Sequence, residues 1–136
     1  MRKADRLHKQ RTAWAEALTE RLQAVEELTL PTVQPNRIHS WHLYPVRLKL
    51  DRLSIDRGQF ITEMKERGIG TSVHWMPLHM HPYYREKYGY CPEDLPVAGA
   101  LYPEMVSLPL YPDLTEEQVG YVCNTIKDVL ARHRKA

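Results

Sequence analysis

The sequence predicts an α+β fold, in which a small mixed or antiparallel sheet is covered by helices. Three observations lead to this prediction: a helical stripe of apolar residues at the start of the chain, alternating polarity over residues 40–50, and a well-capped amphipathic helix near the end. A chain of 136 residues has the length of one domain, and it can bury roughly two-thirds of the surface that its unfolded form exposes. We therefore expect residues 1–136 to form a single domain.

Residues 2–28 have the pattern of one long helix. Apolar side chains recur at steps of three, four and seven positions, which places them in one stripe along a helix. Pro31 and Pro35 end the pattern, because proline lacks the N–H that a helix interior requires. The stripe consists of Leu7, Trp14, Leu18, Leu22, Val25 and Leu28.

Residues 40–50, SWHLYPVRLKL, alternate in the way that is typical of a half-buried strand. Arg47 and Lys49 share the face that we expect to be exposed. Pro45 has no N–H to donate to a neighbouring strand, so it predicts an edge or a bulge at that position. The opposite, buried face consists of His42, Tyr44, Val46, Leu48 and Leu50.

A helix and a second strand are expected next. Ser54 or Asp56 can cap a helix over residues 54–68, and Gly68 can end it. The segment IGTSVHW, residues 69–75, then alternates, and His74 falls on its less apolar face. Since the more apolar face should pack against the helices, we expect His74 to point away from the core of the domain. That apolar face consists of Ile69, Thr71, Val73 and Trp75.

The rest of the chain ends in a strongly signalled helix. Residues 76–96 contain too many prolines for a regular element, whereas residues 97–105 predict a short helix and residues 105–112 a strand. Thr115 and Gln118 form a capping box that begins the last helix. The apolar stripe of this helix consists of Val119, Val122, Ile126, Val129 and Leu130.

Composition argues against several classes of protein. The net charge is only +2, from 19 basic and 17 acidic residues that are mixed along the chain, whereas nucleic-acid binders concentrate positive charge. Cys91 and Cys123 have no CxxC spacing, which favours reduced thiols in a cytoplasmic protein. No apolar run approaches the ~18 residues of a membrane span, and the charged N-terminus has no apolar signal core. We expect neither a nucleic-acid partner nor a membrane.

The stretch GIGTSVHWMPLHMHPYY, residues 68–84, concentrates histidine and aromatic residues. His74, His79 and His81 could be metal ligands, because zinc accepts neutral imidazoles. However, the chain has no H-E-x-x-H motif, and it also lacks G-x-S-x-G and phosphate-binding glycine motifs. We expect no metal site. By pattern alone, this stretch is a histidine- and aromatic-rich edge, and the pattern does not identify a reaction for it.

Three blocks of sequence carry a resemblance to a known family. HSWHLYPVRL, RGIGTSVHWMPLHMHPYY and LPVAGALYPEMVSLPLYPDLTEEQVGYV, in that order, resemble the C-terminal part of the DegT/StrS family. Its members are pyridoxal-phosphate (PLP)-dependent aminotransferases of nucleotide-linked keto sugars. The stretch VHWMPLHMHPYY is most similar to members that aminate C4 of the sugar, such as those of the pseudaminic acid type.

The resemblance implies a small domain of a fold-type I PLP-dependent transferase. Residues 1–30 would be the helix that links the large and small domains, and residues 37–133 would be the α+β small domain. Nothing in the chain matches the motifs of the large domain, which carries the cofactor lysine and the phosphate-binding groups. Lys49, Lys65 and Lys87, like Lys127, fall at small-domain positions. We therefore expect no PLP site and no catalysis in this chain alone, with PLP bound by the full-length parent.

The resemblance also assigns roles to the histidine-rich stretch. His74 matches the histidine on the substrate side, and its implied role is to hydrogen-bond the sugar rather than to transfer a proton. Trp75 and His79, together with Pro77 and Leu78, would line or support the same rim. The methionine and aromatic residues of the stretch would meet the large domain or a second subunit, so we expect a homodimer or self-association. A stand-alone interaction or regulatory module that uses the same fold without catalysis is the alternative.

Overall fold

The computed structural model describes residues 3–135. Its helices are α1 (Ala4–Leu22), α2 (Arg57–Glu66), α3 (Pro82–Tyr88), α4 (Pro96–Leu101) and α5 (Glu116–Arg132). Its strands are β1 (Leu28–Thr29), β2 (Tyr44–Leu48) and β3 (Met105–Leu108), and they form one antiparallel sheet in the order β1-β2-β3. The predicted α+β class, with a small sheet covered by helices, is confirmed.

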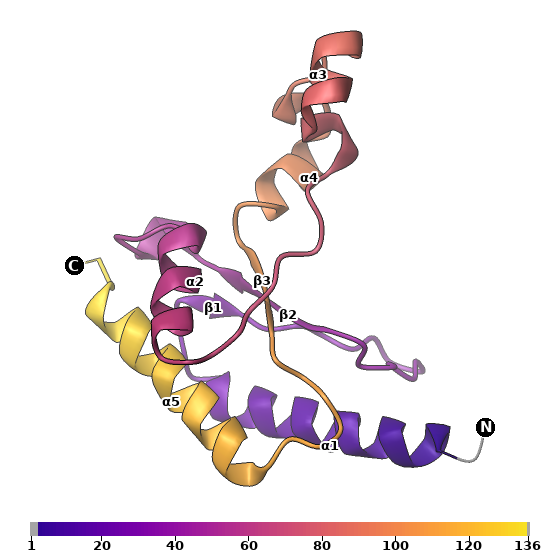
Figure 1. Cartoon of the computed structure of the whole chain (residues 1–136), viewed down its shortest axis with the longest axis vertical. Helices are drawn as coiled ribbons and strands as arrows, with labels where there is room; N and C mark the ends of the chain where they lie inside the picture. The colour runs from indigo at the N-terminus through magenta and orange to yellow at the C-terminus, as the bar shows by residue number, and fades with distance from the viewer. Residues whose placement is uncertain (1–2, 136) are drawn as a thin grey trace.

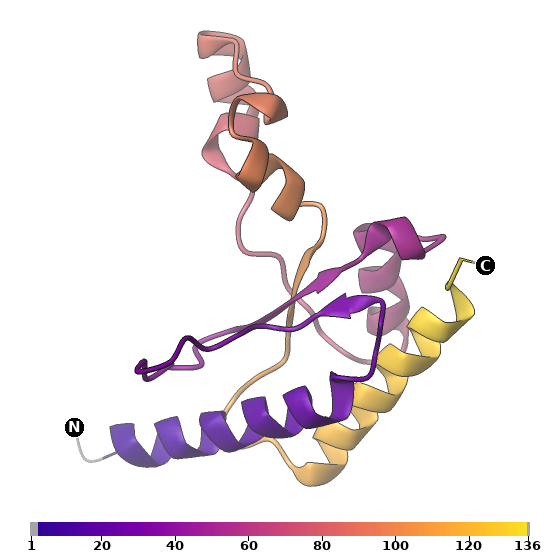
Figure 2. The ribbon, with the colours of Figure 1, turned by 180° about the vertical axis from the view of Figure 1, so that it is seen from behind.

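The helices α1, α2 and α5 cover one face of the sheet. Figures 1 and 2 show α1 and α5 side by side on this face, with α2 beside α5. The alternation of β2 explains the choice of face, because Tyr44, Val46 and Leu48 are buried while Arg47 is exposed. The expectation for His42 was wrong, because His42 lies before β2 and is exposed. The largest fully buried side chains come from α1, α2, α5 and the strands, and they include Leu18, Leu22, Tyr44, Val46, Leu48, Phe60, Met64, Val106, Val119, Ile126 and Leu130.

Pro45 lies in the central strand, but at a position where its missing N–H costs nothing. It stands opposite Ser107 of β3. Ser107 exchanges both of its backbone hydrogen bonds with Ser72, at 2.8 and 3.1 Å, so its backbone groups point away from β2. Pro45 and Ser107 are therefore a non-hydrogen-bonded pair. On its other side β1 reaches only Arg47 and Leu48, which leaves Pro45 at a local edge as expected.

The first helix is shorter than predicted. It ends at Leu22, whereas the sequence pattern continued to residue 28. The chain turns where the Val25 N–H bonds to the Leu22 carbonyl, and Leu28 then pairs with Leu48 in the sheet. Leu28 is buried as the pattern indicated, but in a strand rather than a helix. A single apolar residue fits the helical period and the strand period equally well, so its position alone did not distinguish the two.

The caps of the other two long helices agree with the sequence. Asp56, not Ser54, caps α2 and accepts a hydrogen bond from the Gln59 N–H at 2.8 Å, while Gln59 bonds back to the Asp56 N–H. Thr115 and Gln118 form the predicted capping box of α5. Gly68 follows α2 with a φ of +73°, a conformation that suits glycine.

The expected strand over residues 69–75 is not formed. Ser72 alone bridges to β3, through Ser107. Ile69 is buried as predicted, but Trp75 at the other end of the expected apolar face is 80% exposed. Beyond Ser72 the chain leaves the sheet, so alternation alone overestimated the length of backbone pairing.

Residues 75–101 form an arm that projects from the body of the molecule, at the top of Figure 1. The prediction of an irregular segment after residue 76 was wrong, because α3 forms there. Pro82 occupies the first turn of α3, where no N–H is needed, and Gly89 ends it with a φ of +71°. The short helix α4 confirms the helix expected over residues 97–105.

The arm is structurally separate from the body. Each of the hydrogen bonds described for residues 75–101 joins two residues of the segment 75–104. No residue of this range belongs to the hydrophobic core or to the half-buried side chains packed on it. Among the helices between residues 3 and 135, none is long and apolar enough to cross a membrane.

Candidate functional site

His74 lies where the arm joins the outer face of the sheet. Its Nδ1 atom is 3.2 Å from the hydroxyl of Ser107. Ser107 alternates with the core residues Val106 and Leu108 of β3, so its side chain lies on the face opposite the helices. His74 therefore points away from the core, as predicted, although the strand that motivated this prediction is absent.

Trp75 packs its ring edge to face with the imidazole of His74. The two ring centroids are 5.2 Å apart, at an interplanar angle of 86°, and the peptide bond between the two residues is cis. Leu78 is also mostly exposed, while Pro77 is half-buried. The exposed side chains at this junction present an apolar and aromatic rim next to the His74 ring.

His79 lies differently from its neighbours. Its side chain is 4% exposed, and neither ring nitrogen has a hydrogen-bond partner among the described residues. It comes from the short 3-10 turn Leu78–Met80 and packs inside the arm. His79 can therefore support the rim from within, but in this structure its imidazole does not face the surface.

The histidines of this stretch do not converge on a metal site. His74 contacts Ser107, whereas the Nε2 atom of His81 is 3.1 Å from the Met76 carbonyl oxygen. Among residues 3–135, no group of three or more histidine, cysteine or carboxylate side chains is arranged to hold a metal ion.

Two contacts join the base of the arm, residues 102–104, to the body, and sequence reasoning did not identify them. The Arg57 guanidinium lies 4.4 Å from the centroid of the Tyr102 ring and also donates to the Tyr102 carbonyl. Arg47 donates from two nitrogens to Glu104, at 2.7 and 2.9 Å. These side chains come from separate elements, so no local sequence signal could have paired them.

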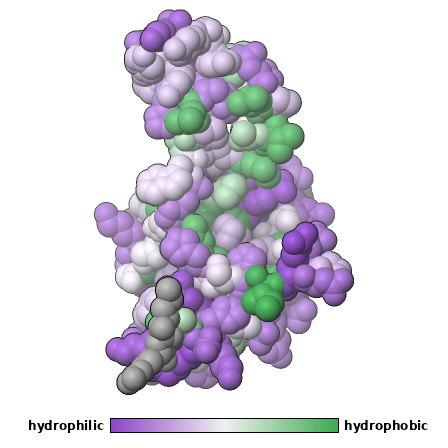
Figure 3. Space-filling view, turned by 90° about the vertical axis from the view of Figure 1, so that its right-hand side faces the viewer, coloured by the Kyte–Doolittle hydropathy of each residue, from purple (hydrophilic) through white to green (hydrophobic). Residues whose placement is uncertain are grey.

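The outer part of the arm carries a tyrosine cluster, composed of Tyr83, Tyr84, Tyr88 and Tyr90. Neighbouring ring centroids lie 5.3 to 6.1 Å apart, and the Lys87 ammonium lies over two of the rings, at 5.2 and 5.3 Å. Between this tip and the body, Figure 3 shows hydrophobic side chains gathered on the surface. Eight large apolar side chains of the arm are exposed: Trp75, Met76, Leu78, Tyr83, Tyr88, Tyr90, Leu95 and Val97.

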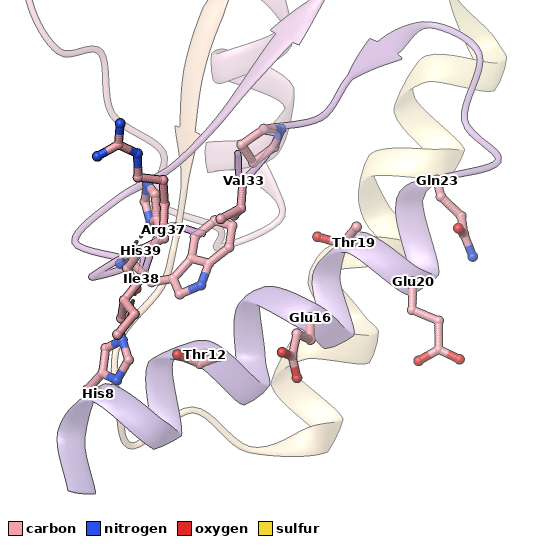
Figure 4. Close-up of a pocket in the computed structure, with 12 residues that line it drawn as sticks. His8, Thr12, Glu16, Thr19, Glu20, Gln23, Val33, Arg37, Ile38 and His39 are labelled. Atoms are coloured by element: carbon pink, nitrogen blue, oxygen red, sulfur yellow. Dashed lines mark hydrogen bonds between the residues drawn. The ribbon is translucent and has the colours of Figure 1, made fainter. Parts of the chain in front are cut away.

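A groove of about 670 Å³ lies elsewhere, between α1 and the loop that precedes β2. Figure 4 shows Val33 and Ile38 on the loop side and Glu16 and Glu20 on the helix side, with the two carboxylates directed away from the loop. At one end, His8 Nε2 is 2.9 Å from the His39 carbonyl oxygen. No residue of the 68–84 stretch lines this groove, and its lining brings together no nucleophile and base.

Two curated relatives match almost the whole chain. The uncharacterized protein MJ1066 of Methanocaldococcus jannaschii is 41% identical over 134 residues, which are 98% of this chain and 35% of the relative. The spore coat polysaccharide biosynthesis protein SpsC of Bacillus subtilis is 34% identical over 131 residues, 96% of this chain and 34% of the relative. The chain thus spans about a third of the length of these relatives.

Solved structures share the fold. Helicobacter pylori PseC, an aminotransferase involved in the biosynthesis of pseudoaminic acid, superposes with a TM-score of 0.87 at 21% identity, over 96% of this chain and 34% of its own. The PMP form of the putative sugar aminotransferase Spr1654 from Streptococcus pneumoniae superposes with a TM-score of 0.84 at 25% identity, over 96% of this chain and 32% of its own.

The family itself follows from a match that is nearly as long as the chain. The model of the DegT/DnrJ/EryC1/StrS aminotransferase family matches residues 1–127, which include α1, the whole sheet, the arm and most of α5. The site and the fold that surrounds it therefore lie within the matched region, and the chain belongs to the DegT/DnrJ/EryC1/StrS aminotransferase family.

Proposed function

We propose that this chain is the C-terminal, substrate-capping part of a PLP-dependent aminotransferase that converts a nucleotide-linked keto sugar to an amino sugar. The family match and the relative in polysaccharide biosynthesis support this proposal. Within it, residues 1–30 contain the linking helix and residues 37–133 the small domain. The C4 position of a sugar of the pseudaminic acid type is the finer proposal, supported by the sequence of residues 73–84 and by the similarity to PseC.

The observation that carries the proposal is the placement of His74 at the junction of body and arm. An imidazole on the outer face, fixed by Ser107 and flanked by the exposed Trp75, is available to a ligand. Trp75 and Leu78 would line the rim on the sugar side, and His79 would support it from inside the arm. In this arrangement His74 binds and orients the sugar, while the chemistry is supplied by PLP in the rest of a family-length protein.

The residues of this chain do not themselves fit PLP. Lys65, Lys87 and Lys127 are exposed, and Lys49 is half-buried beside β2. A phosphate is best held by free N–H groups at the start of a helix. The starts of α2 and α5 are instead occupied by their own caps, Asp56 and Thr115, and α5 carries acidic residues in its first turn. No step of the reaction is therefore assigned to a lysine of this chain.

A first experiment tests that assignment. Titration of the 136-residue chain with PLP, borohydride reduction and peptide mapping should give weak labelling spread over several lysines. An amino-donor assay should give no turnover, because Lys65, Lys87 and Lys127 are exposed and the starts of α2 and α5, which could hold a phosphate, are occupied by their own caps. A single stoichiometric lysine adduct with turnover on a nucleotide keto sugar would show that the chain is catalytic by itself.

A second experiment tests the role of His74. In a chimera, this chain replaces the matching third of SpsC, so that the rest of the relative can supply the cofactor site. His74→Ala should weaken sugar binding by a few-fold to tenfold, the equivalent of about 0.5–1.5 kcal/mol for one hydrogen bond. PLP absorbance should not change. His42→Ala is the matched control, because His42 is exposed and its imidazole makes none of the described contacts; unchanged sugar affinity in His74→Ala would refute the assignment.

The partner and the compartment complete the proposal. Self-association, or a homodimer in the full-length protein, would cover the exposed apolar side chains of the arm, since exposed patches of this kind mark interaction sites. A cytoplasmic location is proposed from the two free cysteines, of which Cys91 is exposed.

If the SpsC chimera binds PLP but has no activity, the alternative of an interaction module without catalysis gains support, because the projecting arm suits it equally well.

A further inference from the structure

We infer that Ser107 selects the tautomer of His74, so that the site presents an imidazole N–H donor to an oxygen atom of its ligand. The tautomer itself follows from the contacts within this chain. The identity of the ligand as a keto sugar rests on the proposed function. Ser107 is thus a positioning residue, which acts through His74.

Ser107 is buried and paired through its backbone. It stands in β3, is 4% exposed, and exchanges both backbone hydrogen bonds with Ser72. Its side chain leaves the sheet on the outer face, beneath the segment that carries His74. The hydroxyl therefore has little freedom to find a distant partner or to reach water.

The proton of this hydroxyl needs an acceptor. A serine hydroxyl carries one proton, and buried polar groups are nearly always hydrogen-bonded. Among residues 3–135, the one partner described for Ser107 Oγ is His74 Nδ1, at 3.2 Å. If Nδ1 carried a proton and donated it, the serine proton would be buried without an acceptor. Ser107 therefore donates to Nδ1, and the neutral imidazole carries its proton on Nε2.

The Nε2–H group of His74 is then the available end of the ring. Nδ1 is engaged by Ser107, and the indole of Trp75 stands perpendicular to the ring at 5.2 Å. An N–H group in this position donates to a ligand atom with a lone pair, such as a carbonyl or hydroxyl oxygen of a sugar, which accepts the hydrogen bond. Within the proposed function, His74 orients the sugar by donation to one of its oxygens.

The tautomer can be measured directly on the 136-residue chain. Two-bond ¹H–¹⁵N correlation spectra of the ¹⁵N-histidine-labelled protein distinguish the two tautomers, and the His74→Ala spectrum assigns the signal. We expect the Nε2–H form in the wild type and a mixture of both forms in Ser107→Ala. Ser107→Thr, which keeps a hydroxyl on a strand-compatible side chain, should restore the single form. Ser72→Ala is the matched control, because it removes the hydroxyl of the paired but exposed serine.

The Nδ1–H form in the wild type, or an unchanged tautomer in a folded Ser107→Ala protein, would overturn the inference. If Ser107→Ala does not fold, the wild-type spectrum decides by its purity, because a free neutral imidazole samples both forms, whereas one held by Ser107 shows the Nε2–H form alone. In the SpsC chimera, Ser107→Ala should also weaken sugar binding several-fold, with rescue by Ser107→Thr. An inactive chimera would count against the proposed function and leave the tautomer result intact, so the two failures can be told apart.

Discussion

At the scale of single residues, Glu27 is a buried carboxylate next to an exposed cation. Its side chain is 2% exposed, and it pairs with Arg134, which lies just beyond α5. Burial by itself would raise the pKa of Glu27, but the hydrogen bonds from Arg134 and from the backbone, with the charges of Arg134 and Arg52, lower it below its ordinary value. The pair therefore fastens the C-terminal end of the chain to the segment between α1 and β1.

Arg134→Ala should lower the melting temperature by several degrees at neutral pH, because it leaves a buried carboxylate without its partner. The pKa of Glu27 is lower in the folded chain than the unfolded value of about 4.3. The pair thus stabilises the fold above that pH, and its contribution is lost as the pH falls through the folded pKa. The difference in melting temperature between Arg134→Ala and the wild type should therefore shrink below about pH 4.

Arg132→Ala is the control for this measurement. Arg132 pairs with Asp128 at 2.8 Å, but both side chains are about half exposed, and exposed pairs contribute little. Thermal unfolding followed by circular dichroism across pH checks the prediction. Equal melting temperatures for Arg134→Ala and the wild type at neutral pH would contradict it.

Sequence reasoning reached part of the site at this scale. The face of His74 could be predicted, because it follows Ser72, the bridged residue, by two positions on the same side of the extended chain. The same alternation failed at Trp75, which is exposed. The burial of His79 could not, because it depends on the packing of the arm around a proline-rich turn. Ser107 had only a weak signal, a polar residue between two core residues of a strand.

At the scale of elements, the capping box of α5 was the most predictable feature. It depends on Thr115 and Gln118, three positions apart, so local sequence contains the information, whereas for α2 the sequence left the cap open between Ser54 and Asp56. A strand at residues 69–75 would depend on tertiary pairing with β3. The helix α3 depends on the fact that the first turn of a helix tolerates proline. Local patterns therefore misjudged both of them.

Asp56→Ala should destabilise the chain by about 0.5–2 kcal/mol, the usual cost of losing an N-cap. Ser54→Ala should have a smaller effect, since the Ser54 hydroxyl bonds to the exposed His133 carbonyl and caps no helix. Urea unfolding of the two variants beside the wild type measures the difference. Sequence alone allowed either residue to be the cap, so an equal or larger loss in Ser54→Ala would reverse the structural assignment.

At the scale of the whole molecule, the body and the arm differ in how they are stabilised. The body has a continuous core from α1 to α5, whereas the arm contributes no side chain to it. The four exposed aromatic side chains of the arm, Trp75, Tyr83, Tyr88 and Tyr90, are 43–80% exposed and alone offer roughly 400–500 Å² of surface. A standard interface buries about 800 Å² on each partner, so the arm can supply a large share of one.

The isolated chain should therefore self-associate through its arm. Replacement of Leu78 and Val97 by serine should reduce both self-association and apolar dye binding, because these side chains are 66% and 73% exposed on the arm. Ile38→Ser is the control, since Ile38 is 91% exposed but lies outside the arm. Sedimentation over a range of concentrations measures the association. A wild-type chain that stays monomeric at high concentration without dye binding would remove the case for a covering partner.

The attachment of the arm has a further consequence for how such proteins can diversify. The chain enters and leaves the arm next to Ser72 and Ser107, which are already paired in the body. A segment inserted between two neighbouring points of a closed fold can be exchanged for another of different length or sequence without rearranging the core. The arm is therefore a natural unit of exchange, through which relatives with the same body could acquire different neighbours at the rim.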